Sequence, residues 1–263
     1  MSKNSLLLTF SSLLLAASLC CAQTEMKVPA PEPTERTPPA ASGPSEGPFS
    51  TVGIGIQLSL LGPGVEVATP LANNSNLRVA FNTFSYTRTF SQDGVNYSGQ
   101  LTFRSAQVSY DWFPFAGSFH LSPGVMVYNG NQVKANAAVP GGQTFTLNGT
   151  TYSSDASDPI SGNGSLTFNK VAPEVLVGWG NLVPRNGKHI SIPFEVGAVY
   201  QGTPKFGLNL TGTACDSTGL ICDNVSSDPT FQNNLQAQRA KYQKDVSPFR
   251  FYPVISVGFG YRF

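Results

Sequence analysis

The chain has 263 residues and a formal net charge of +1, and only 12% of its residues are charged. Soluble domains usually carry about twice that share of charged residues, and without a basic excess the chain cannot neutralise the phosphates on which nucleic-acid binding depends. With 26 glycines, 18 phenylalanines and 11% aromatic residues, this composition predicts a β protein that contacts a solvent other than water and binds no nucleic acid.

Residues 1–22 have the pattern of a secretory signal peptide. Lys3 precedes an apolar run that ends at Leu19, and small residues follow. The run is too short to cross a membrane as a helix. Cys20 and Cys21 leave a lipoprotein as the alternative, but a lipobox has a small residue before its cysteine, whereas Leu19 precedes Cys20.

Residues 23–49 are expected to form a proline-rich periplasmic linker. Seven prolines lie between positions 27 and 49. Proline disfavours regular helix and sheet, so the segment should be an extended spacer. No later apolar run reaches the roughly 18 residues that a transmembrane helix needs.

The remaining segment, residues 50–263, alternates apolar residues with small and polar ones. Near its end, Ile255, Val257, Phe259 and Tyr261 alternate with serine, glycine and arginine. Successive side chains point to opposite faces of a strand, so one face is apolar, as on the lipid side of a transmembrane barrel. Eight such strands are expected, at about residues 52–60, 64–71, 77–89, 100–113, 119–129, 169–180, 189–201 and 249–263.

The number and length of these strands predict the fold class. An even number of strands near ten residues long can close into a bacterial outer-membrane barrel. We therefore predict an all-β fold, an eight-stranded antiparallel up-and-down transmembrane β-barrel with long extracellular loops and a short loop helix.

The fourth expected strand changes the phase of its alternation. Leu101 and Phe103 would face outward at its start, whereas from Ala106 onward the even-numbered residues do. A change of phase requires one extra residue in the strand, so we predict a β-bulge near Arg104 and Ser105.

The connections predict the orientation of the barrel. They are short after strands two, four and six, and longer after strands three, five and seven, at residues 90–99, 130–168 and 202–247. Outer-membrane barrels have short periplasmic turns and longer external loops. We therefore expect a bacterial outer-membrane protein with both chain ends in the periplasm.

The last long loop contains a cysteine pair. Cys215 and Cys222 are the only cysteines outside the expected signal peptide. Because the expected compartment is oxidising, we predict a disulfide between them and no metal site.

The same loop is expected to contain a short helix. Asp228 suits the N-cap and Pro229 the first helical position, and Phe231, Leu235 and Tyr242 recur at helical spacing. We expect this helix to pack on the barrel rim or in its mouth; the alternative is a helix that binds a partner.

The inward-facing positions carry charges of both signs. Because the interior of an eight-stranded barrel is just wide enough to be filled by side chains, we predict a lumen charge network. Arg78 is expected to pair with Asp111. Glu174 and Glu195 are expected to lie opposite each other, as part of a structural cluster with a cation or, alternatively, as an acid/base pair. The network is expected to comprise Glu66, Arg78, Arg104, Asp111, Lys170, Glu174, Glu195, Arg250 and Arg262.

The terminal stretch SVGFGYRF resembles a barrel-insertion signal through Ser256, Gly258, Tyr261 and Phe263. With the eight alternating segments, residues 51–263 resemble the eight-stranded transmembrane domain of the outer membrane protein A family. The resemblance implies that the barrel-assembly machinery recognises the last strand. No peptidoglycan-binding domain follows the barrel, unlike in the two-domain members of that family.

Catalytic residues are not evident in the sequence. Lipid A-modifying barrels need a nucleophile and a base at the outer leaflet, whereas His120 and His189 begin strands that rise from the expected periplasmic turns. No metal-ligand spacing or glycine-rich phosphate loop occurs, so we expect no cofactor and no enzymatic activity.

The expected function is therefore that of a membrane anchor which displays its loops. Its partners would be outer-membrane lipid, the assembly machinery and a surface ligand or host partner of the loops. A narrow porin-like channel is the alternative, followed by a lipid A-modifying enzyme.

Overall fold

The computed structural model describes residues 47–92, 94–115 and 117–263. The expected signal peptide and most of the expected linker therefore lie outside the described residues.

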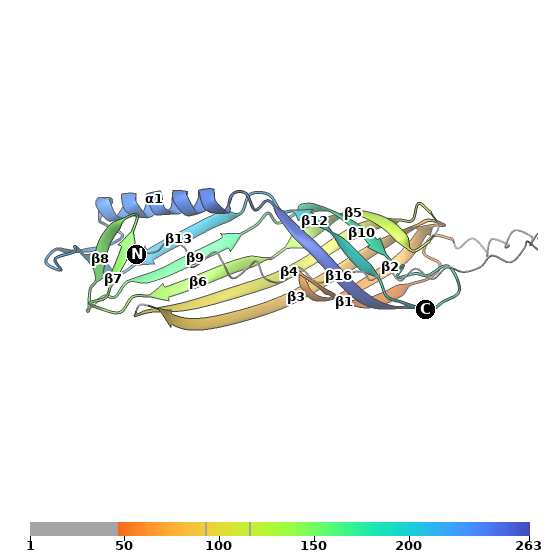
Figure 1. Ribbon diagram of the computed structural model, residues 1–263, viewed down its shortest axis with the longest axis horizontal. Coiled ribbons are helices and arrows are strands. Elements are labelled where there is room, and N and C mark those ends of the chain that lie inside the picture. Colours follow the sequence, from red (N-terminus) through yellow and green to blue (C-terminus); the bar gives the residue numbers. More distant parts are fainter. Residues whose placement is uncertain (1–46, 93, 116) are drawn as a thin grey trace, which may run out of the picture. The chain divides into compact units, whose positions relative to one another are not determined.

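Eight strands form a closed antiparallel barrel, which confirms the predicted fold class. They are β1 (Gly53–Ser59), β2 (Gly62–Ala72), β3 (Ser75–Gln92), β4 (Val95–Trp112), β5 (Phe119–Asn129), β10 (Ala172–Trp179), β12 (Phe194–Tyr200) and β16 (Phe251–Arg262). Neighbours are paired in the order β4-β3-β2-β1-β16-β12-β10-β5, and β5 pairs with β4 to close the ring (Figure 1). The short β11 (Ile190–Ser191) pairs with β16.

Apolar side chains cover the outside of the barrel. On β1, Ile54, Ile56 and Leu58 are 46%, 63% and 65% exposed, whereas the residues that alternate with them, Gly53, Gly55 and Gln57, are buried. This alternation places the apolar face on the outside and the small and polar face in the lumen, as lipid surroundings require.

The strands β3 and β4 continue past the barrel into a second sheet, here called the extension sheet. Each of the two strands has 18 residues. Beyond the barrel, β6 (Gln132–Ala138), β9 (Ser161–Thr167) and β13 (Lys205–Thr211) continue the sheet in the order β3-β4-β6-β9-β13 (Figure 1). The segments expected to be long loops are therefore largely regular structure, because a sheet pairs backbone groups that isolated loops would leave to water.

The two faces of β3 and β4 exchange polarity where the strands leave the barrel. Pairing between them runs without a register shift from Ser75 opposite Trp112 to Gln92 opposite Val95. Within the barrel the lumen face is polar and the outer face apolar, and above it the order is reversed. Along the lumen face of β3 the residues are Arg78, Ala80 and Asn82, then Phe84, Tyr86, Arg88 and Phe90; along the outer face they are Leu77, Val79 and Phe81, then Thr83, Ser85, Thr87 and Thr89.

This reversal overturns the prediction of a bulge near Arg104 and Ser105. The ring of Phe103 lies 5.9 Å from that of Tyr252, which packs against the core inside the barrel. Phe103 and Leu101 thus share the inner face, and the apparent change of phase is a change of surroundings. A register shift does occur against β5, between Ala106 and Gln107 of β4.

A small sheet and the helix complete the extension. The small sheet contains β7 (Thr144–Leu147), β8 (Thr150–Ser154), β14 (Thr213–Cys215) and β15 (Cys222–Asn224). The helix α1 (Pro229–Val246) begins after Asp228, whose carboxylate accepts a hydrogen bond from the N–H of Thr230.

The helix packs on the extension and not on the barrel rim, which corrects the expected position. Phe231 and Leu235 are 0% and 1% exposed and share a core with Tyr152 and Val225. Figure 1 shows α1 lying along β13. The apolar residues at helical spacing were thus interpreted correctly, but their partner is a sheet that local periodicity does not reveal.

Candidate functional site

Arg78 lies at the centre of a buried charge cluster in the lumen. Its Nη1 donates to Glu66 Oε2 at 3.2 Å and to Glu195 Oε2 at 2.7 Å. Its Nε and Nη2 donate to the carboxylate of Asp111 at 3.1 and 3.0 Å, and Nη2 also donates to Glu195. All four residues are at most 5% exposed. The five N–H donors of a guanidinium suit such a site better than an ammonium would.

Hydroxyl and imidazole groups complete the cluster. Ser122 donates to Asp111 Oδ1 at 2.7 Å, and Ser256 to Glu195 at 3.4 Å. The Nε2 of His120 lies 2.9 Å from Glu195 Oε1. The participation of His120 was missed in the sequence, although its position on the inward face of β5, level with the glutamate, could have indicated it.

Four expected lumen charges lie elsewhere. Arg104 is exposed because it shares the outer face of β4, just above the apolar band. Lys170 and Arg250 are exposed at the mouth because they precede β10 and β16 and stand outside the paired part of those strands. Arg262 is half-buried at the opposite end, where it donates to the carbonyl of Pro184.

Glu174 and Glu195 do not lie opposite each other. Glu174 pairs with Val199, and Glu195 pairs with Gly178. The register differs from the expected one because residues 181–188 fold under the barrel instead of forming a symmetric turn. Glu174 is buried and accepts a hydrogen bond from Ser109 at 3.1 Å, outside the contacts of Arg78. The expected cross-strand pair of these two glutamates is therefore not formed.

Apolar layers close the lumen on both sides of the charge cluster. On the extension side, a buried group fills the barrel, made of Leu61, Met126, Ala172, Leu176, Val199 and Val254. On the other side, Leu182 and Val183 insert from the loop 181–188 and are 4% and 0% exposed. Gly53 and Gly260 make room for Leu182, because a Cβ at either position would lie 2.3 and 2.2 Å from its atoms.

The four residues of the insertion-like motif all lie in or next to β16. Ser256 and Gly258 face the lumen, where a Cβ at Gly258 would lie 3.1 Å from Glu66 Oε1. Tyr261 faces outward against His189 and Phe263, with ring centroids 5.7 and 5.1 Å away. The packing of the barrel thus accounts for the serine and the glycine, and recognition by the assembly machinery stays a prediction.

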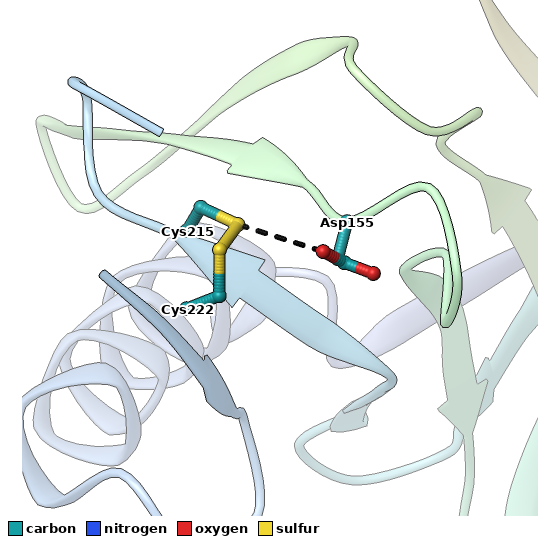
Figure 2. Close-up of side chains that lie close together, drawn as sticks. All are labelled: Asp155, Cys215 and Cys222. Atoms are coloured by element: carbon teal, nitrogen blue, oxygen red, sulfur yellow. Dashed lines mark hydrogen bonds between the residues drawn. A yellow bond between two sulfur atoms is a disulfide. The ribbon is translucent and has the colours of Figure 1, made fainter. Parts of the chain in front are cut away.

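The extension contains the disulfide between Cys215 and Cys222 (Figure 2). Asp155 Oδ2 lies 4.0 Å from the Sγ of Cys215. A sulfur in a disulfide has no proton to donate and no thiolate to bind a metal. In the described part of the chain, these three residues form the cluster of potential metal ligands. While the disulfide is intact, only the carboxylate of Asp155 can bind a metal ion.

Asp216 orders the short loop that the disulfide closes. Its carboxylate accepts hydrogen bonds from the hydroxyl of Thr218 at 2.8 Å and from the N–H groups of Thr218 and Leu220 at 3.2 and 3.1 Å. These bonds, the Thr218 hydroxyl first, lower the pKa of Asp216 below its ordinary value of 3.8. The loop therefore presents Leu220 and Ile221, 85% and 66% exposed, in an ordered conformation.

One solved structure, among the comparisons with known proteins, supports the fold. No family model matches the chain, and no curated protein matches it significantly. The crystal structure of Acinetobacter baumannii CarO2 matches with a TM-score of 0.50 and 21% identity, over 81% of this chain and 98% of that one. Acinetobacter baumannii CarO matches at 0.49 and 19%, over 81% and 97%. A major outer membrane protein from Thermus thermophilus matches at 0.30 and 13%, over 81% and 99%.

The geometry and the CarO2 match define the class of protein. The chain is an eight-stranded β-barrel of the outer-membrane type with a folded extension. At 21% identity the likeness concerns the fold alone. None of the described helices is both long and apolar enough to cross a membrane.

Proposed function

We propose that this chain is a non-enzymatic outer-membrane protein of the OmpA-like eight-stranded type, which anchors the extension and displays it outside the cell. The observation that carries the proposal is the uninterrupted course of β3 and β4 through the barrel and the extension. A shared pair of long strands holds the displayed part rigidly on the anchor. The exposed Leu220 and Ile221 at the tip favour a surface ligand or host partner with an apolar recess.

The filled lumen supports an anchor over a pore. Apolar layers lie above and below the ion pairs of Arg78, and the two internal cavities beside these ion pairs are each about 10 Å³. That volume holds about one water molecule. Hydrated ions do not pass a barrel in which such layers close both ends.

Planar-bilayer recording tests this assignment. The wild-type protein should show no unit conductance at voltages that leave the bilayer intact. Steady conductance steps in the wild type, with an ion selectivity that Glu195→Gln changes, would favour the narrow channel.

The orientation is proposed from the connections and is tested by labelling. Thr87 is exposed on the extension, and Lys188 is exposed at the opposite end of the molecule. In intact cells a membrane-impermeant maleimide should label Thr87→Cys, and it should label Lys188→Cys only after the outer membrane is permeabilised. The reverse pattern would contradict periplasmic chain ends.

An enzymatic function is tested separately. His120 contacts Glu195 through its Nε2 inside the closed lumen. The Nδ1 of His189 lies 3.0 Å from the backbone carbonyl oxygen of Arg262. Neither has access to lipid on the extension side. Lipid A mass spectra should therefore be identical in the wild-type strain and in a strain without this gene.

A further inference from the structure

A notch interrupts the barrel wall at the end opposite the extension. The strand β10 ends at Trp179, whereas its neighbour continues from β12 through Pro193 into β11. The space left beside β11 is a cavity of about 580 Å³ between the turn at 117–118 and the loop 181–188.

Backbone polar groups point into this notch. The N–H of Arg262 donates to His189 O at 2.7 Å, and the N–H of Gly258 donates to Pro193 O at 2.8 Å. Since backbone groups alternate in direction along a strand, those of Ile190 and Ile192 point away from β16. On that side β10 has already ended, and Gly180 lies against the carbonyl of Ile192. The alternation thus directs the N–H groups of both isoleucines towards the side of the cavity that these residues line.

The side chains around the notch combine an apolar surface with positive charge. Trp179, Ile192 and Phe194 line it and are 51%, 67% and 43% exposed on the outer face of the barrel. Lys188 and Arg185 also line it, and no carboxylate does. The guanidinium of Arg185 donates to the backbone of β2 and β3, which leaves Lys188 as the exposed positive group of this lining.

An unfilled notch of this composition is unfavourable in a membrane. Backbone N–H and C=O groups at the edge of the hydrocarbon region need polar partners, whereas the adjoining aromatic and aliphatic side chains favour acyl chains. An amphipathic molecule with an anionic head satisfies both requirements. A water molecule would satisfy only the first and would leave Lys188 without a counter-charge.

We propose that the notch is a binding site for one anionic phospholipid of the adjacent leaflet. The headgroup phosphate binds Lys188 and the N–H groups of Ile190 and Ile192, and the acyl chains lie along Trp179 and Phe194. This inference rests on the proposed position of the barrel in a membrane, and it adds a specific lipid contact to the general one.

The two tryptophans of the chain, Trp112 and Trp179, provide a direct test. Trp112→Phe leaves Trp179 as the only tryptophan, and Trp179→Phe leaves Trp112, which is also exposed on the outer face but does not line the notch. Each full-length variant is reconstituted in phosphatidylcholine vesicles that contain the same small fraction of either dibrominated phosphatidylglycerol or dibrominated phosphatidylcholine. Bromine quenches a tryptophan that the lipid contacts.

The site predicts stronger quenching of Trp179 by the brominated phosphatidylglycerol, because one lysine enriches an anionic lipid about fivefold. Trp112 should show no such preference. In the Trp112→Phe background, Lys188→Gln should abolish the preference. The matched change Lys170→Gln, at the other end of β10, should retain it.

The other outcomes overturn the inference in distinguishable ways. Equal quenching of Trp179 by both lipids would show that the notch holds water or unselected lipid. An equal preference at Trp112 would show a general attraction of the barrel for anionic lipid. If neither lipid quenches either tryptophan, the barrel is not in the membrane, and the proposed function fails with the site.

Discussion

Arg78 is the residue on which the organisation of the lumen depends. It neutralises only one of the three carboxylates it binds, Glu66, Asp111 and Glu195. His120 and serine hydroxyls stabilise the rest by hydrogen bonds. Buried ion pairs do not in general increase stability over apolar packing, but removal of one partner is strongly destabilising. The cluster therefore restricts which side chains the lumen tolerates, although Glu66 Oε1 is buried without a hydrogen-bond partner among the described residues.

Replacement of Arg78 by methionine should destabilise the barrel by about 3–5 kcal/mol, because it leaves buried carboxylates without their cation. The measurement is the urea midpoint of unfolding in detergent micelles, followed by the heat-modifiable shift on gels. Arg88→Met is the matched control, since Arg88 is exposed on the same strand beyond the barrel. Equal midpoints for the two variants would contradict the central role of Arg78.

Asp216 provides a prediction of pH dependence at the tip of the extension. Because its pKa is lowered by hydrogen bonds in the folded loop, the bonds favour the folded state above the ordinary pKa of the carboxyl. That contribution is lost as the pH falls through the lower, folded value. The loop should thus stay ordered at about pH 4, near the ordinary pKa of an aspartate.

Carboxyl carbon NMR of labelled aspartate can follow this titration. Thr218→Val removes the hydroxyl donor and should raise the pKa of Asp216 towards 3.8. Ser217→Ala, a change at the exposed neighbour, should leave the pKa where it is. An unchanged titration in Thr218→Val would show that the hydroxyl does not hold the carboxylate.

Among the elements, the disulfide hairpin between β14 and β15 should be separable from the barrel. The closed loop is short, with a sequence separation of 7, and chain entropy alone then contributes about 2–3 kcal/mol to the local fold. The double change to serine at Cys215 and Cys222 should make residues 216–221 a site of proteolysis. The heat-modifiable shift of the barrel should persist, and its loss would contradict this independence.

The helix α1 should be held by its buried face. Phe231→Ala removes a ring that lies 5.0 Å from that of Tyr152, and a buried phenylalanine typically contributes about 3–5 kcal/mol. Hydrogen exchange of α1 should accelerate strongly in this variant. Tyr242→Ala, on the same helix but 42% exposed, should have a small effect; comparable acceleration would place the helix contacts elsewhere.

The elements of the barrel could be predicted from the sequence because lipid imposes a single rule on every strand. That rule explains the alternation of side chains with a period of two and the apolar residues that face outward. It also explains the charged residues that face the lumen at Glu66, Arg78 and Asp111. The extension could not be predicted, because above Asn82 the same strands obey the opposite rule. Phe103 and Arg104 were therefore assigned to the wrong faces, although the backbone between them is regular.

For the whole molecule, the barrel should fold without the extension. Neighbouring barrel strands pair through residues that belong to the barrel. This holds also for the pairs β1–β16 and β4–β5. The lumen contacts of Arg78 also lie there. We expect a chain in which short turns replace residues 84–102, 131–168 and 203–249 to keep the heat-modifiable shift. A chain of this kind that fails to refold in detergent would show that the extension is needed to nucleate the barrel.

The exchange of faces between Asn82 and Thr83 has a consequence for bilayer thickness. A shift of the β3–β4 hairpin by two residues along its axis would keep the alternation intact, yet it would carry Arg104 into hydrocarbon or Phe81 into water. Both moves cost free energy. The level at which the faces of β3 and β4 exchange polarity therefore fixes the depth of the barrel in the membrane. In a bilayer that is too thick or too thin, the lipid around this protein must deform, because the barrel cannot rise or sink to meet it.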